Sequence, residues 1–195
     1  MTRPVKHPVE VMAHCLQDAK TGLSALPLDP QSIARPHKNP QVRDGGRILR
    51  EALDSTEPAF STHPFVWPHL MVPRLRAFQE AAILLSGGAT PGSRSGPAAE
   101  QLSLVRTLLR TCAAILRTWP HRGRRKARRC ARRIDRLASN ALTPESAAAA
   151  VEAARLLLVK LLPAIGQSGL VSHPEPTSGM VHAAMLRSGP IGFTP

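Results

Sequence analysis

Residues 122–141 read RGRRKARRCARRIDRLASNA, and their spacing is the strongest structural signal in the chain. Nine of the fifteen residues from Arg122 to Arg136 are basic and only Asp135 is acidic, so the isolated segment would repel itself. At about 100° per residue, the small apolar residues share an arc of about 120° opposite most of the basic ones. The apolar residues are Ala127, Cys130, Ala131, Ile134, Leu137, Ala138 and Ala141. The pattern predicts a helix that docks by its apolar side and exposes its arginines.

The preceding segment, residues 98–119, is also amphipathic. Its large apolar residues recur at helical spacing and share one face, while Arg106, Arg110 and Arg117 share another. The Pro-His-Arg-Gly break at 120–123 makes the next helix fold back, which predicts an antiparallel helical hairpin. Packing of the two apolar faces would then allow the three arginines to extend the basic surface.

The remaining sequence predicts an all-α protein, a small helical bundle that contains this hairpin. Residues 1–67 are expected to be a proline-rich N-terminal region with short helices near 8–20 and 46–53, the first ended by Thr-Gly at 21–22. The bundle is expected to span 68–166 and carry the basic helix. Residues 167–195 show little periodicity, and a disordered tail is expected there.

The last helix of the bundle is expected over residues 144–162. Thr143, Pro144 and Glu145 give an N-cap, a first-turn proline and an acidic first turn, while Pro163 ends the pattern. This segment is apolar nearly all round. Such a helix is expected to be the central core helix or the interface of a homodimer.

Charge and composition indicate the kind of partner. The formal net charge is +13, from 26 basic and 13 acidic residues, and an excess of this size favours a polyanion. Arginine, which suits bidentate phosphate contacts, outnumbers lysine by 21 to 5, although a GC-rich coding sequence would produce the same bias. The N-terminus lacks the apolar run of a secretory signal, and no segment is predicted to span a membrane.

The leading functional hypothesis is a non-catalytic nucleic-acid-binding accessory or regulatory protein, which makes mainly phosphate contacts with DNA or RNA. The basic face of this helix lacks the Asn and Gln residues that read adenine, so sequence specificity is not predicted. The expected location is cytoplasmic and nucleoid-associated in a bacterium, or nuclear in a eukaryote or virus. The candidate nucleic-acid-binding residues are Arg106, Arg110, Arg117, Arg122, Arg124, Arg125, Lys126, Arg128, Arg129, Arg132, Arg133 and Arg136.

The alternative hypothesis is a protein-interaction adaptor, whose basic helix docks an acidic protein partner or an anionic membrane surface. The small apolar face of that helix suits packing against another helix better than insertion into lipid. A third reading, an enzyme, is disfavoured because no Ser/His/Asp grouping or paired carboxylates stand out, and no cofactor is expected. The eight histidines include no HExxH motif and no pair at i, i+4, and the three cysteines include no CxxC pair, so no metal site is predicted.

Overall fold

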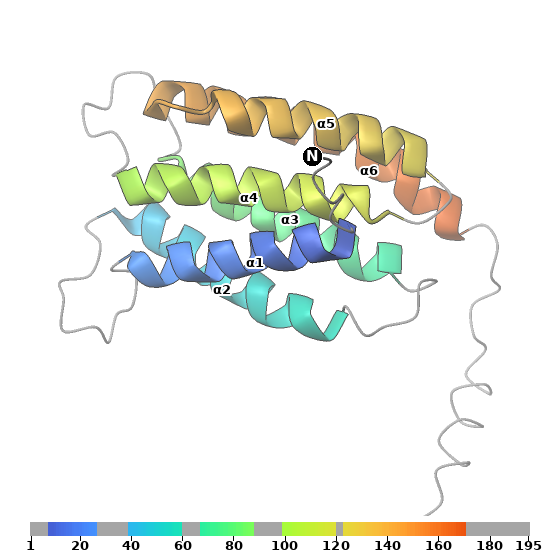
Figure 1. Ribbon diagram of the computed structural model, residues 1–195, viewed down its shortest axis with the longest axis horizontal. Coiled ribbons are helices and arrows are strands. Elements are labelled where there is room, and N and C mark those ends of the chain that lie inside the picture. Colours follow the sequence, from blue (N-terminus) through green and yellow to red (C-terminus); the bar gives the residue numbers. More distant parts are fainter. Residues whose placement is uncertain (1–7, 27–38, 60–66, 88–98, 120–122, 171–195) are drawn as a thin grey trace, which may run out of the picture.

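Six α-helices make up the part of the chain that the computed structural model describes, namely residues 8–26, 39–59, 67–87, 99–119 and 123–170 (Figure 1). These ranges contain no strand, which confirms the predicted all-α class. The expectation of a disordered tail falls largely on residues 171–195, outside the described ranges. The helices are α1 (Pro8–Ala25), α2 (Pro40–Ala59), α3 (Trp67–Leu85), α4 (Ala99–Arg117), α5 (Arg124–Asn140) and α6 (Pro144–Leu170).

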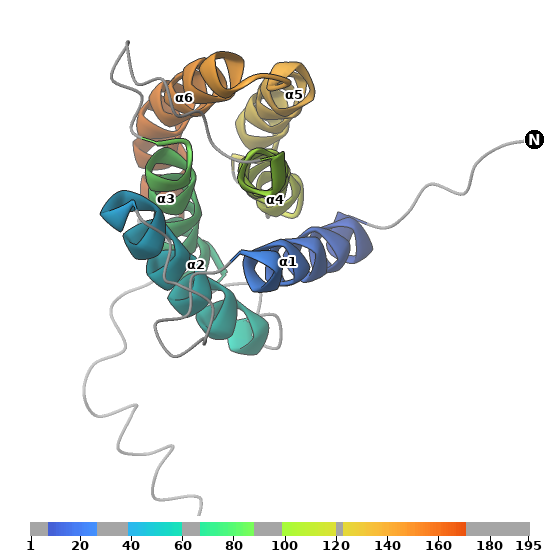
Figure 2. The same cartoon turned by 90° about the vertical axis from the view of Figure 1, so that its left-hand side faces the viewer.

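Helix α4 is the central helix, because it packs against α1, α3, α5 and α6 (Figure 2). Its residues are buried on several sides, and the small Ala113 and Ala114 leave room for neighbours. Thr111 is also fully buried, and its hydroxyl donates to the Thr107 carbonyl at 2.9 Å. The sequence had suggested the helix that begins at Pro144 as the central one. That helix is instead exposed on one side, at Leu156 and Val159. Apolar content alone did not reveal which helix has neighbours all round.

The helical packing extends further toward the N-terminus than the range 68–166 predicted from sequence. Helix α1 continues through the expected stop at residues 21–22, and it buries Met12 and Leu16 against the common core. Helix α2 has 20 residues and is longer than the short helix expected near 46–53, and it packs on α3. A Cβ atom added at Gly45 would lie 3.0 Å from the Cβ of Leu84, so a glycine allows these two helices to approach closely.

The start of α6 follows the sequence prediction. The Thr143 hydroxyl accepts a hydrogen bond from the Ser146 backbone N–H at 3.2 Å, and the Ser146 hydroxyl accepts one from the Thr143 N–H at 2.9 Å. This reciprocal pair satisfies two donors at the helix start. The helix continues past its predicted end at Pro163. Proline has no backbone N–H, so a carbonyl group one turn earlier lacks its helical hydrogen bond, but Pro163 is exposed and water can bond to that carbonyl.

Helices α4, α5 and α6 run alternately up and down. Figure 1 shows α5 running back along α4, and α6 running back along α5, so the predicted antiparallel hairpin is present. The hairpin turn includes residues 120–122, which lie outside the described ranges. Gly123 precedes α5 in the left-handed backbone conformation, with a φ of 86°. A Cβ atom at this position would lie 2.9 Å from Cγ2 of Ile165, so the start of α5 is seated closely against α6.

Candidate nucleic-acid interface

One side of α5 is a continuous cationic surface, here called the α5 basic face. Every one of its eight side chains is exposed. Arg122, which the sequence also assigned to this surface, lies outside the described residues. The members of the α5 basic face are Arg124, Arg125, Lys126, Arg128, Arg129, Arg132, Arg133 and Arg136.

The opposite side of α5 is buried in the bundle. Ile134 is fully buried, and the small side chains around it allow α5 to lie close to both α4 and α6. The predicted division of this helix into an apolar buried side and an arginine-rich exposed side is therefore confirmed, except that Leu137 is only half-buried. The other buried members are Ala127, Cys130, Ala131 and Ala138.

The middle of the basic face is a row formed by Arg125, Arg129, Arg132 and Arg136. Successive members are three or four residues apart and share one line along the helix, so the row is about 16 Å long at about 1.5 Å per residue. Among the described residues, no carboxylate forms an ion pair with any member of the α5 basic face. Crowded like charges of this kind disfavour the helix, and an anionic partner would relieve their repulsion.

The single acidic residue of α5, Asp135, does not neutralise the row. Its carboxylate accepts a hydrogen bond from the Arg117 guanidinium of α4 and pairs with it. Burial raises the pKa of the Asp135 carboxyl above its usual value, and the charges of Arg117 and Arg110 oppose part of that rise. The ion pair ties α5 to α4, and the α5 basic face contains no acidic residue.

The three arginines of α4 therefore differ in their availability to a partner. Arg110 is exposed, whereas Arg117 pairs with Asp135. Arg106 is half-buried, and its Nε atom is buried with no hydrogen-bond partner among the described residues. Of the extension predicted from α4, Arg110 is the member that has both an exposed side chain and no ion pair within the described part of the chain.

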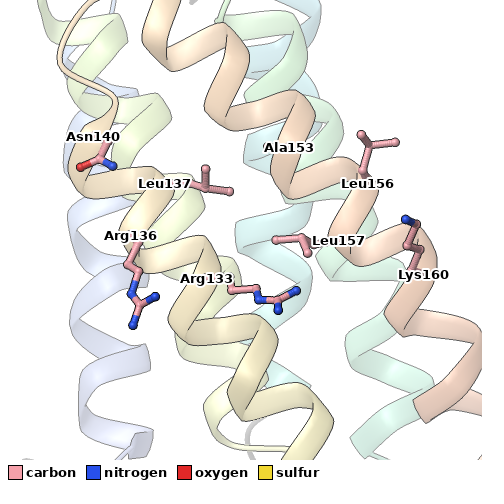
Figure 3. A pocket seen from close by; sticks show the side chains of 8 residues that line it. All are labelled: Arg133, Arg136, Leu137, Asn140, Ala153, Leu156, Leu157 and Lys160. Carbon is pink, nitrogen blue, oxygen red and sulfur yellow. The ribbon is translucent and has the colours of Figure 1, made fainter.

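A cation that sequence reasoning missed is Lys160 of α6. It lies across a groove from Arg133 and Arg136 of α5 (Figure 3). In the sequence, Lys160 interrupts an apolar segment and gives no hint that it borders the basic helix. The antiparallel packing of α5 and α6 brings the three cations to one opening.

Cys112 and Cys130 are buried thiols, and Cys15 is half-buried. Burial raises the pKa of Cys112 to about 12 and that of Cys130 to about 11, from 9.0. Burial also raises the pKa of Cys15, with a further contribution from the charge of Asp18. Thiolates attack far more readily than thiols, so these groups are poorly suited to catalysis at neutral pH.

These raised pKa values predict a loss of stability in alkali. A thiol whose pKa is higher in the fold than in the unfolded chain stabilises the fold fully below about pH 9, and this stabilisation is lost as the pH rises toward 11 or 12. We expect the free energy of unfolding to be about 2 kcal/mol lower at about pH 10 than at about pH 8. Denaturant titrations measure this difference. In the double variant Cys112→Ala/Cys130→Ala, this difference between the two pH values should largely disappear. Equal unfolding free energies of the wild type at both pH values would contradict the prediction.

Neither a metal-ligand cluster nor a membrane-spanning helix is found in the described ranges. Three or more His, Cys, Asp or Glu side chains do not gather there in a way that could hold a metal ion. No helix in the same part of the chain has both the length and the apolar character needed to cross a membrane. Comparison of the chain with protein-family models, with curated proteins and with solved structures gives no match.

Proposed function

We propose that this protein binds nucleic acid without catalysing a reaction, and that the α5 basic face makes mainly phosphate contacts. The observation that carries the proposal is the exposed row of guanidinium groups, which no described carboxylate neutralises. A protein that replaces condensed counterions along a phosphate backbone gains affinity from their release. We propose that its role is accessory or regulatory. The protein would then lie in the cytoplasm with the nucleoid if it is bacterial, and in the nucleus if it is eukaryotic or viral.

The chemistry of the row favours phosphate over base contacts. The α5 basic face contains arginine and lysine and no Asn or Gln, whereas selective adenine readout uses those amides. Arginine presents a planar fork that pairs with two phosphate oxygens. We therefore expect similar affinities for duplexes of different sequence.

The burial of the apolar side of α5 weighs against membrane insertion by this helix. Amphipathic helices that bind membranes place their apolar side among the acyl chains. In this protein the apolar side, centred on Ile134, is buried against α4 and α6. Insertion would have to break the packing of the bundle, whereas phosphate binding uses side chains that are already exposed.

The salt dependence of binding tests the proposal. With a fluorescently labelled duplex, the slope of the logarithm of the affinity against the logarithm of the salt concentration should be roughly −5, if about six phosphates are neutralised. Fluorescence anisotropy across a salt series measures this slope. A flat slope, or no binding at low salt, would remove the proposal.

A further inference from the structure

An open groove of about 420 Å³ lies between α5 and α6 (Figure 3). Leu137 of α5 and Leu157 of α6 point toward one another across it, and Leu156 adds a third leucine to its lining. Leu156 is 48% exposed although it is a large apolar residue. The groove therefore has space and an apolar surface that the bundle itself does not cover.

Three cations border this apolar surface. Arg133 and Arg136 line it from α5, and Lys160 lines it from α6. No acidic side chain is among the residues that line the groove in the described part of the chain. An occupant that matches both properties needs apolar side chains for the leucines and negative charges on either side of them.

A nucleic-acid backbone matches only one of these properties. Phosphates pair with the cations, but they gain nothing from three leucines. The groove lining contains no aromatic ring on which a base could stack. The exposed leucines are thus a feature that the phosphate-binding role of α5 does not use.

We propose that the α5–α6 groove docks an amphipathic acidic helix of a partner protein. Leucine-like side chains at i, i+3, i+4 and i+7 of that helix would cover Leu137, Leu156 and Leu157, as in other helix-in-groove complexes. Its flanking Glu or Asp residues would pair with the cations on the two sides. This inference does not require the proposed nucleic-acid function, although the groove shares Arg133 and Arg136 with the α5 basic face.

Neither the residues outside the described ranges nor the same groove of a second copy is a suitable occupant. The sequence outside the described ranges contains only two acidic residues, Asp29 and Glu175, so it offers no acidic stripe. A second copy facing this groove with its own groove would set Arg133, Arg136 and Lys160 against the same three cations. Charge complementarity favours a different, acidic protein.

Synthetic peptides and the full-length protein test the proposal directly. The probe is a labelled helical peptide with leucines at i, i+3, i+4 and i+7 and glutamates on both flanks. A second peptide keeps every glutamate and replaces each leucine by serine, so it has the same charge and no apolar stripe. In fluorescence anisotropy titrations, the first peptide should bind saturably and at least about tenfold more tightly than the second.

Two matched variants of α6 locate the binding. Leu156 lines the groove and Val159 does not, while their exposed fractions are similar at 48% and 55%. Leu156→Asp and Val159→Asp introduce the same charge at exposed positions of the same helix. We expect Leu156→Asp to weaken binding of the leucine peptide at least about tenfold, and Val159→Asp to weaken it less than about threefold.

Several outcomes would overturn the proposal. These are equal binding of the leucine and serine peptides, equal effects of the two variants, or no saturable binding of the leucine peptide up to about 1 mM. A loss of duplex affinity in Leu156→Asp that is much larger than in Val159→Asp would assign the groove to nucleic acid instead. Peptide binding that is lost while duplex binding persists separates this proposal from the proposed function.

Discussion

Replacement of Arg125, Arg129 and Arg132 by glutamine should lower the affinity for duplex DNA by about two to three orders of magnitude at about 0.1 M salt. The reason is that each lost phosphate contact removes about 0.9 from the magnitude of the salt slope, so three lost contacts remove about 2.7. The three side chains are exposed and have no ion-pair partner among the described residues, so their replacement leaves the core intact. Anisotropy titrations at several salt concentrations measure both effects.

A charge-matched variant separates the basic face from the overall charge of the protein. Arg43, Arg50 and Arg76 are exposed on α2 and α3, helices that do not pack against α5. Their replacement by glutamine lowers the net charge by the same three units, and we expect it to leave the salt slope nearly unchanged. If both triple variants lose affinity equally, binding responds to net charge and α5 is not the interface. Loss of helical circular dichroism in the α5 variant would show that its arginines support the fold.

Replacement of Gly123 by alanine should destabilise the protein by about 2 to 5 kcal/mol. Two costs combine at this position, because alanine disfavours the positive φ and its Cβ would meet Ile165 of α6 at 2.9 Å. Relief of that contact requires α5 or α6 to move at the point where they approach each other. Denaturant unfolding followed by circular dichroism measures the loss.

Gly87 provides the control for backbone strain alone. Its φ of 87° matches that of Gly123, but a Cβ added at Gly87 would meet no atom within 4 Å. Gly87→Ala should therefore cost only about 1 kcal/mol, the usual cost of an alanine in the left-handed region. If the two alanine variants have equal stability, the contact with Ile165 does not contribute.

The basic helix could be predicted from the sequence because its signal is local. Apolar residues such as Ala127, Ile134 and Ala138 recur at helical spacing within a segment that is otherwise arginine-rich. Their spacing along the chain is enough to place them on the opposite side of the helix from the arginines. The structure buries all three. The break before Gly123 likewise predicted the return of the chain, which produces the α4–α5 hairpin.

Features that depend on how helices are rotated against each other were not predictable. The pairing of Arg117 with Asp135 needs α4 and α5 to face each other at one particular angle, which periodicity does not supply. The placement of Lys160 opposite Arg133 depends in the same way on the packing of α6. The choice of the central helix also depends on the whole set of contacts, and no single segment determines it.

Prolines were a second source of error in the predicted helix boundaries. Pro163 was expected at a helix end, but it lies inside α6, and Pro73 likewise lies inside α3. Both are exposed, so water can satisfy the carbonyl groups that these prolines leave without a backbone partner. A proline on the outer side of a long helix is less disruptive than one that faces the core.

Because α4 and α6 are the only described helices that pack against α5, it lies at the border of the bundle, and its basic face is exposed among the described residues. Its 17 residues extend about 25 Å, which corresponds to about seven base pairs of a double helix at about 3.4 Å per pair. If α5 lies along a duplex, as we propose, the footprint of one molecule is therefore short. Many copies could then bind side by side along one duplex. The fraction of the duplex that is covered would depend on the protein concentration more than on the base sequence.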